Sequence, residues 1–245
     1  DNVLIGHKAG NLLTTGDNNV AIGSGAALAL VSGESNVAIG TNALLSAAVG
    51  ESYNIAIGHH TFRYMDEGTA GGDIDFNIAI GHSAFQGGDL AGNDRQIQDN
   101  IAIGAYALDA TSDNAQTGTI AIGRSALSAC TSGAGNTAVG YRAGMTATGG
   151  ANTLLGYDAG RLLLGATHNT LVGYLAGDAL AASEERNIAI GSNAMADLNE
   201  GNSQVDDNIA IGYGALTASS LHNSGNAAVG NIAIGSYALD ATGTN

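Results

Sequence analysis

Histidine, acidic and tyrosine side chains are the residues of this chain that could carry chemistry. The first group is His59, His60 and His82, because imidazole nitrogens are common metal ligands. His59 and His82 occupy the same position in two neighbouring copies of a sequence repeat, so we expect them to lie close together. No carboxylate shares that position and there is no His-x-His pattern, so we expect exposed turn histidines and no metal site.

Clustered carboxylates form the second group. They are Asp66, Glu67, Asp73 and Asp75 in one segment and Asp89, Asp94 and Asp99 in the next. The spacing Asp73-x-Asp75-x-Asn77 resembles the start of a calcium loop, but Ile78 stands where an EF-hand needs glycine. Clustered oxygen ligands could still bind calcium, and simple solvation of acidic loops is the alternative. Arg63, Tyr64 and Arg95 in these segments could anchor a receptor.

Three tyrosines, Tyr141, Tyr157 and Tyr174, share one position in three consecutive copies of the repeat. They predict an aromatic ladder on the outside of the fold. Packing of the rings against one another is sufficient reason for such a ladder. A flat tyrosine stripe is also a surface that binds sugars, so both interpretations stay open.

Motifs for enzymatic chemistry are missing from the chain. It contains no Gly-x-Ser-x-Gly, no P-loop lysine motif and no His-Glu-x-x-His. The single cysteine, Cys130, has no histidine near it in the sequence and excludes an internal disulfide or a cysteine-based metal site. We expect no catalytic residue, and we expect Cys130 to be a small apolar filler.

Composition narrows the class of protein further. The chain has 245 residues, 44% of them hydrophobic, with 38 glycines, no proline and a formal net charge of −15. A surface with this much negative charge repels the phosphate backbone of nucleic acids, which makes nucleic acid a poor partner. No signal peptide and no apolar run near 18 residues is present, so we expect no membrane insertion by this segment.

A repeat covers the whole chain. Its template is Asn, a β-branched residue, a small apolar residue, Ile or Val, Gly, two variable residues, Ala, then Leu or Gly. Thirteen copies start at Asn2, Asn19, Asn36, Asn54, Asn77, Asn100, Thr119, Asn136, Asn152, Asn169, Asn187, Asn208 and Asn231. The last copy could also start at Asn226. Because the chain begins and ends inside the repeat, we expect a single domain, 1–245, that is part of a longer fibrous protein.

The spacing of the copies varies from 16 to 23 residues while the template is kept. This pattern predicts a fixed strand and a loop of variable length. The motif "NIAIG" alternates with period two, and a strand of about five residues is stable only when it stacks on others. We therefore predict an all-β, parallel β-solenoid of about 13 coils. The stacked Asn side chains should hydrogen-bond along the rod or cap a turn backbone. Stretches such as "AALALVSG" could alternatively form helix.

The two β-branched positions, for example Val20 and Ile22, are expected to fill the interior of the coil. The position between them should then point outward, although it is never polar. An exposed apolar stripe of this kind calls for a cover, and the simplest cover is the same face of another chain. This argument predicts a homo-oligomer through the following residues: Ala21, Ala38, Ala56, Ala79, Ala102, Ala121, Ala138, Ala189, Ala210 and Ala233.

The segments "NVAIGSGAAL", "TIAIGRSAL" and "NTAVGYRAG" resemble the head repeats of trimeric autotransporter adhesins. They are equally similar to the "NTAVGYxAG" repeats of bacteriophage tail fibres. The resemblance implies a left-handed parallel β-roll, a homotrimer, and display outside the cell at a cell surface or virion tail. The repeat departs from the adhesin pattern in length, because the adhesin head repeat is near fourteen residues.

The function expected from these patterns is a non-enzymatic structural and adhesive rod. Its partner would be a cell-surface glycan or protein receptor, bound by the long loops at about residues 63–76, 86–99, 196–207 and 217–230. One alternative is a polysaccharide-degrading tailspike with paired carboxylates. Another is a monomeric ice-binding solenoid, for which only Thr137, Thr153 and Thr170 align, on the face expected to be interior.

Overall fold

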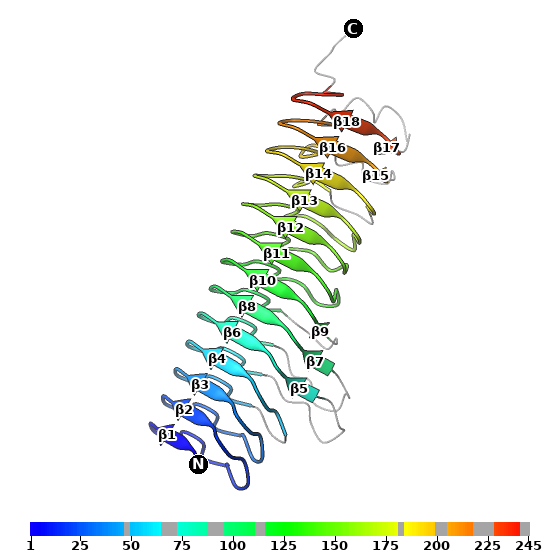
Figure 1. The fold of residues 1–245 in the computed structure, drawn as a ribbon. Helices are drawn as coiled ribbons and strands as arrows, with labels where there is room; N and C mark the ends of the chain where they lie inside the picture. The colour runs from blue at the N-terminus through cyan, green and yellow to red at the C-terminus, as the bar shows by residue number, and fades with distance from the viewer. Residues whose placement is uncertain are drawn as a thin grey trace.

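A computed structural model describes residues 1–46, 50–64, 73–87, 96–110, 116–180, 184–198, 205–217 and 228–240. These residues form an all-β structure without helix, in which short parallel strands stack into a β-solenoid (Figure 1). The expectation of a parallel solenoid is confirmed. The turn-forming residues 26–29 show that "AALALVSG" is not a helix. Within the part of the chain that is described, no helix is long and apolar enough to cross a membrane.

The main sheet has 13 strands. Their bounds are β1 (Val3–Ile5), β2 (Val20–Ile22), β3 (Val37–Ile39), β4 (Ile55–Ile57), β6 (Ile78–Ile80), β8 (Ile101–Ile103), β10 (Ile120–Ile122), β11 (Thr137–Val139), β12 (Thr153–Leu155), β13 (Thr170–Val172), β14 (Ile188–Ile190), β16 (Ile209–Ile211) and β18 (Ile232–Ile234). Each strand pairs with the same template positions of its neighbours, as in Val20↔Val37. The pairing of β16 with β18 places the last copy at Asn231.

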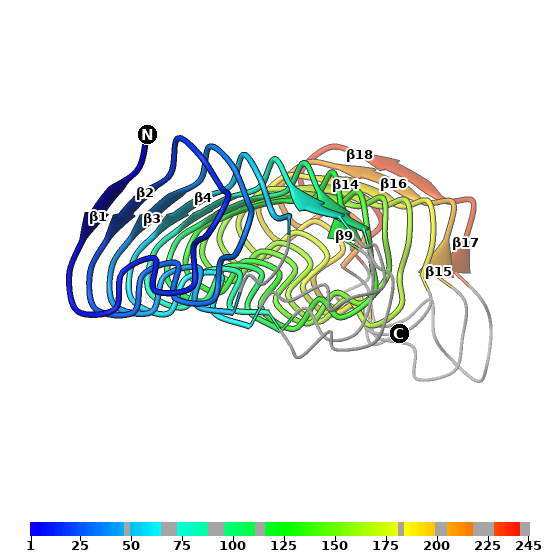
Figure 2. The same cartoon turned by 90° about the horizontal axis from the view of Figure 1, so that it is seen from below.

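Longer copies add a second strand just before the template asparagine. β5 (Asp73–Asp75), β7 (Gln96–Gln98) and β9 (Gln116–Thr117) form a three-stranded parallel sheet, and β15 (Val205–Asp206) pairs with β17 (Ala228–Val229). Figure 2 shows the main strands along one side of the stacked coils, with β15 and β17 at a neighbouring corner. The sequence alone did not lead us to these strands.

The prediction of which face points inward was wrong. Ala21, Ala56 and Ala102 are fully buried inside a single chain, whereas the β-branched residues on either side of each alanine are partly exposed. The coil is too thin for two layers of large side chains. Alanine from the strand therefore shares one buried cluster with larger residues that follow the strands, such as Leu30 and Phe62. The alanine column consequently forms the interior of the coil and not an oligomer face.

A glycine ends every main strand at a φ between about +128° and +144°, which side chains avoid. The backbones of successive coils also touch there. A Cβ at Gly104 would lie 2.6 Å from the carbonyl oxygen of Gly123, and one at Gly123 would lie 2.2 Å from that of Gly140. The template therefore requires glycine for two reasons. Its φ disfavours any side chain, and the backbone of the next coil leaves no room for a Cβ.

The asparagine column forms a buried hydrogen-bonded ladder, as predicted. The side chain of Asn77 donates through Nδ2 to Oδ1 of Asn54 at 3.1 Å and to the Ile97 carbonyl at 2.6 Å. Its Oδ1 accepts from Nδ2 of Asn100 at 2.9 Å and from the backbone N–H of that residue at 3.1 Å. Each amide thereby joins three successive copies of the repeat.

Candidate functional site

The most extensive candidate surface is the outer face of the main sheet, defined here as the first and third residue of each main strand. Twenty-three of these 26 positions are Val, Ile or Leu, and the exceptions are Thr137, Thr153 and Thr170. The parallel register aligns them in two continuous columns. Ile211 is 37% exposed and Ile234, on the last strand, is 67% exposed. Soluble single chains rarely leave so long an apolar surface uncovered.

The histidines that the sequence singled out do lie together. The rings of His59 and His82 are stacked with centroids 5.3 Å apart, and His60 lies 3.7 Å from His59. Burial lowers the pKa of His60, and the neighbouring guanidinium of Arg63 lowers it further. Within the described residues, no group of three His, Cys, Asp or Glu side chains is arranged to hold a metal ion.

The acidic segments are described only in part. Asp66, Glu67, Asp89, Asp94 and Arg95 lie outside the described residues, as do the central parts of all four long loops. Asp73 and Asp75 flank the buried Ile74 on β5, so both point away from the interior. Oδ1 of Asp75 accepts the backbone N–H of Ser52 at 2.7 Å, and burial raises the pKa of this carboxyl.

Arg63 and Tyr64, the proposed anchors of the first loop, pack on each other. The Arg63 guanidinium carbon lies 4.7 Å from the centroid of the Tyr64 ring. Arg63 also approaches Nδ1 of His60 at 3.4 Å. These contacts connect the beginning of the first long loop to the histidine group, so the two candidate features of the sequence belong to one surface region.

The tyrosine ladder is present as predicted. Ring centroids are 5.0 Å apart between Tyr141 and Tyr157 and 5.4 Å apart between Tyr157 and Tyr174, with interplanar angles of 20° and 23°. All three side chains are exposed, Tyr174 by 51%. The ladder lies in the turns that follow β11, β12 and β13, directly after the conformationally restricted glycines.

Two arginine–aspartate pairs run beside the tyrosine ladder. Nε of Arg142 donates to Oδ1 of Asp158 at 2.8 Å, and Nε of Arg161 donates to Oδ1 of Asp178 at 2.9 Å. Both pairs are bidentate, and Arg142 lies 4.9 Å from the centroid of Tyr141. Asp158 raises the pKa of Arg142, so this cation stays charged at any physiological pH.

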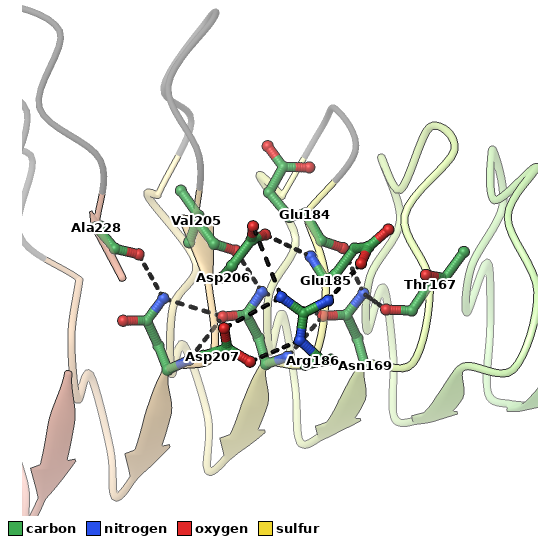
Figure 3. Close-up of polar contacts among 11 residues, drawn as sticks. Thr167, Asn169, Glu184, Glu185, Arg186, Val205, Asp206, Asp207 and Ala228 are labelled. Atoms are coloured by element: carbon green, nitrogen blue, oxygen red, sulfur yellow. Dashed lines mark hydrogen bonds and ion pairs between the residues drawn. The ribbon is translucent and has the colours of Figure 1, made fainter. Parts of the chain in front are cut away.

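A further charged group, around Arg186, was not predicted from the sequence. Figure 3 shows Arg186 between Glu185, Asp206 and Asp207, beside the asparagine ladder. Nε of Arg186 donates to Oδ1 of Asp207 at 2.6 Å, and this bond lowers the pKa of Asp207. The signal in the sequence was "EER" and "VDD" at the same template positions of consecutive copies. The group joins two coils at the corner that precedes the main strands.

Cys130 is fully buried and its Sγ donates to the carbonyl of Gly133 at 3.3 Å. Burial raises the pKa of the thiol, which keeps it protonated and weakly reactive. This geometry agrees with a filler role. The chain matches no protein-family model, no curated protein and no solved structure, so the fold and the surfaces described above are what support a function.

Proposed function

We propose that this chain is a non-enzymatic structural rod that associates with copies of itself through the outer face of the main sheet. The observation that carries the proposal is the double column of Val, Ile and Leu that stays partly exposed along 13 strands. At about 4.8 Å per strand this face is roughly 60 Å long. Covering it with identical faces removes apolar surface from water at every coil.

The number of subunits that we propose is three, about a shared axis. Support comes from the resemblance to trimeric adhesin heads and tail-fibre repeats, which also implies the left-handed sense of the coils. The number of coils that we propose, thirteen, comes from the number of copies of the repeat. The observed orientation of the strands strengthens the case for self-association, because Ile and Val on the outer face offer far more apolar area than the alanines that were first assigned to the interface. Glutamate or lysine is absent from all 26 positions of the outer face.

The proposed role of the rod is display and adhesion at a cell surface or virion tail. The partner would be a glycan or protein receptor, held by loops and turns outside the sheet, because the ladder itself cannot vary without loss of stacking. The uniform template supports this role more than a catalytic one. A tailspike enzyme would need a pair of carboxylates facing each other in a groove. Asp75, from one of the acidic segments, instead accepts the backbone N–H of Ser52.

Oligomerisation is tested with two matched substitutions in one coil. Ile39→Glu places a charge on the outer face, where an assembly would bury it without a partner, at a cost of several kcal/mol. Thr41→Glu places the same charge two residues away in an exposed turn. Light scattering should give near three times 24.2 kDa for the unmodified chain and for Thr41→Glu, and a smaller mass for Ile39→Glu.

A monomeric mass for the unmodified chain would contradict the proposal. Such a result would favour the ice-binding alternative. Thr137, Thr153 and Thr170 were expected in the interior, but they lie on the outer face. They are in register on three adjacent strands only. The remaining ten main strands carry Val or Ile at that position, which suits contact between chains better than an ordered array of hydroxyls.

A further inference from the structure

The tyrosine ladder continues into an arginine at its N-terminal end. Arg124 occupies the turn after β10, in the same template position as Tyr141 in the next coil. The backbone register confirms this stacking, since the N–H of Arg142 donates to the Arg124 carbonyl and the N–H of Asp158 donates to the Tyr141 carbonyl. We call the surface formed by Arg124, Tyr141, Tyr157 and Tyr174 the arginine–tyrosine strip.

Polar groups of this strip are unpaired. Arg124 is exposed and forms no ion pair or side-chain hydrogen bond with any described residue, whereas Arg142, Arg161 and Arg186 are all held by carboxylates. The three phenol hydroxyls also lack a hydrogen-bond partner within the described ranges. The strip therefore offers one free guanidinium and a row of hydroxyls at the spacing of the coils.

Charge is distributed unevenly along the chain in a way that favours an anion at this strip. Residues 114–183 contain three arginines, Arg124, Arg142 and Arg161, and only two carboxylates, Asp158 and Asp178. The rest of the chain contains 20 of the 22 acidic residues and four of the seven basic ones. Because Asp158 and Asp178 are already bound to Arg142 and Arg161, the uncompensated charge of this region is that of Arg124.

The stack also restricts how a sugar could bind. Tyr157 has Tyr141 on one side at 5.0 Å and Tyr174 on the other at 5.4 Å, so both of its ring faces are covered. A neutral sugar that packs its apolar face on an aromatic ring would find no free face there. The exposed parts of Tyr157 are therefore its ring edge and its hydroxyl, which suit hydrogen bonds to sugar hydroxyls.

We infer that the arginine–tyrosine strip binds a carboxylated saccharide, with the sugar carboxylate on Arg124 and the neighbouring sugar hydroxyls along the tyrosine hydroxyls. A planar guanidinium pairs with a carboxylate through two parallel hydrogen bonds. The Arg142–Asp158 and Arg161–Asp178 pairs hold the turns rigid, so little ordering is needed on binding. This inference rests on the proposed adhesive function and specifies the ligand class of that rod.

The test measures binding of the full chain to 3′-sialyllactose and to trigalacturonate, with lactose as the neutral control and a sulfated, carboxyl-free saccharide as the anionic control. Both carboxylated probes represent the proposed class, and at least one of them should bind while neither control does. Arg124→Gln should weaken that binding about tenfold or more, since it removes a charge-assisted pair. Tyr157→Phe keeps the stack, removes one hydroxyl, and should weaken binding several-fold.

Lys8→Gln is the matched control variant, because Lys8 is also an exposed cation without a partner in the described residues but lies far away in the first coil. It should leave binding unchanged. Binding of neither carboxylated probe, equal binding of either control saccharide, or undiminished binding by Arg124→Gln would overturn the inference. Attachment of the unmodified rod to intact cells is measured in parallel. Attachment that survives Arg124→Gln refutes this site alone, whereas absence of attachment to every cell type tested refutes the adhesive function.

Discussion

At the scale of single residues, backbone conformation decides which template positions are fixed. Many turn positions have φ near +50° to +60° and are still occupied by ordinary residues such as Tyr53, Ser83 and Leu108. Each of these costs about 1 kcal/mol or more, which the stacked coils offset. The glycine after each main strand is different, because its φ near +135° is combined with direct contact to the next coil.

Two glycine substitutions separate these effects. Gly104→Ala adds a Cβ at 2.6 Å from the carbonyl oxygen of Gly123 and should lower the free energy of unfolding by about 3 kcal/mol or more. Gly118→Ala has φ +64° and meets nothing within 4 Å, so the cost should be about 1 kcal/mol. Urea unfolding followed by circular dichroism compares them. Equal losses for the two variants would show that contact between coils is unimportant.

At the scale of elements, the asparagine ladder is the feature that ties one coil to the next. Its bonds from the backbone N–H of one template residue to the side-chain oxygen of the preceding one are interrupted once, at Thr119, whose hydroxyl accepts the N–H of Gly135 instead of that of Asn136. Asn136 then turns its amide to the carbonyls of Gly133 and Gly149. The ladder therefore consists of two runs that meet between β10 and β11.

Removing one rung should have a local effect. Asn77→Ala leaves the Ile97 carbonyl and the amide groups of Asn100 without their buried partners, and should cost about 3 kcal/mol. Asn11→Ala is the control, since Asn11 is exposed and its side chain makes no hydrogen bond within the described residues. Hydrogen exchange should quicken in the coils next to residue 77 and stay unchanged farther away, because each coil contacts only its neighbours. Uniform quickening along the rod would contradict a ladder of independent rungs.

At the scale of the whole molecule, the apolar outer face and the high negative charge have opposite effects on self-association. A net charge of −15 per chain makes association of copies electrostatically unfavourable, while the outer face favours it. The proposed saccharide site has the opposite sign, since it joins an anion to a cation. Salt should therefore act on the two kinds of binding in opposite directions.

Raising the ionic strength from about 20 mM to about 500 mM shortens the screening length several-fold. Self-association, measured by sedimentation at several protein concentrations, should become tighter over this range. Binding of a carboxylated saccharide should become weaker over the same range. Self-association that weakens with added salt would indicate that ion pairs, and not the outer face, hold the copies together.

Sequence by itself determined the period of the fold, the parallel strands, the asparagine ladder, the close pair His59–His82 and the stacked tyrosines. These follow from residues that recur at equal positions, because stacking in register places equal positions side by side. Only the tertiary structure decided which face of each strand is buried. Period two separates Ala102 from Ile101 and Ile103 but does not say which side is the interior. The usual preference for large residues inside failed because the coil has room for only one layer of large side chains, and Leu171 fits the inward position only where Gly177 faces it. The tertiary structure also decided that Arg186 bonds to Asp207. Both residues directly precede a template asparagine, so stacking places them side by side, but the sequence does not show that their side chains meet.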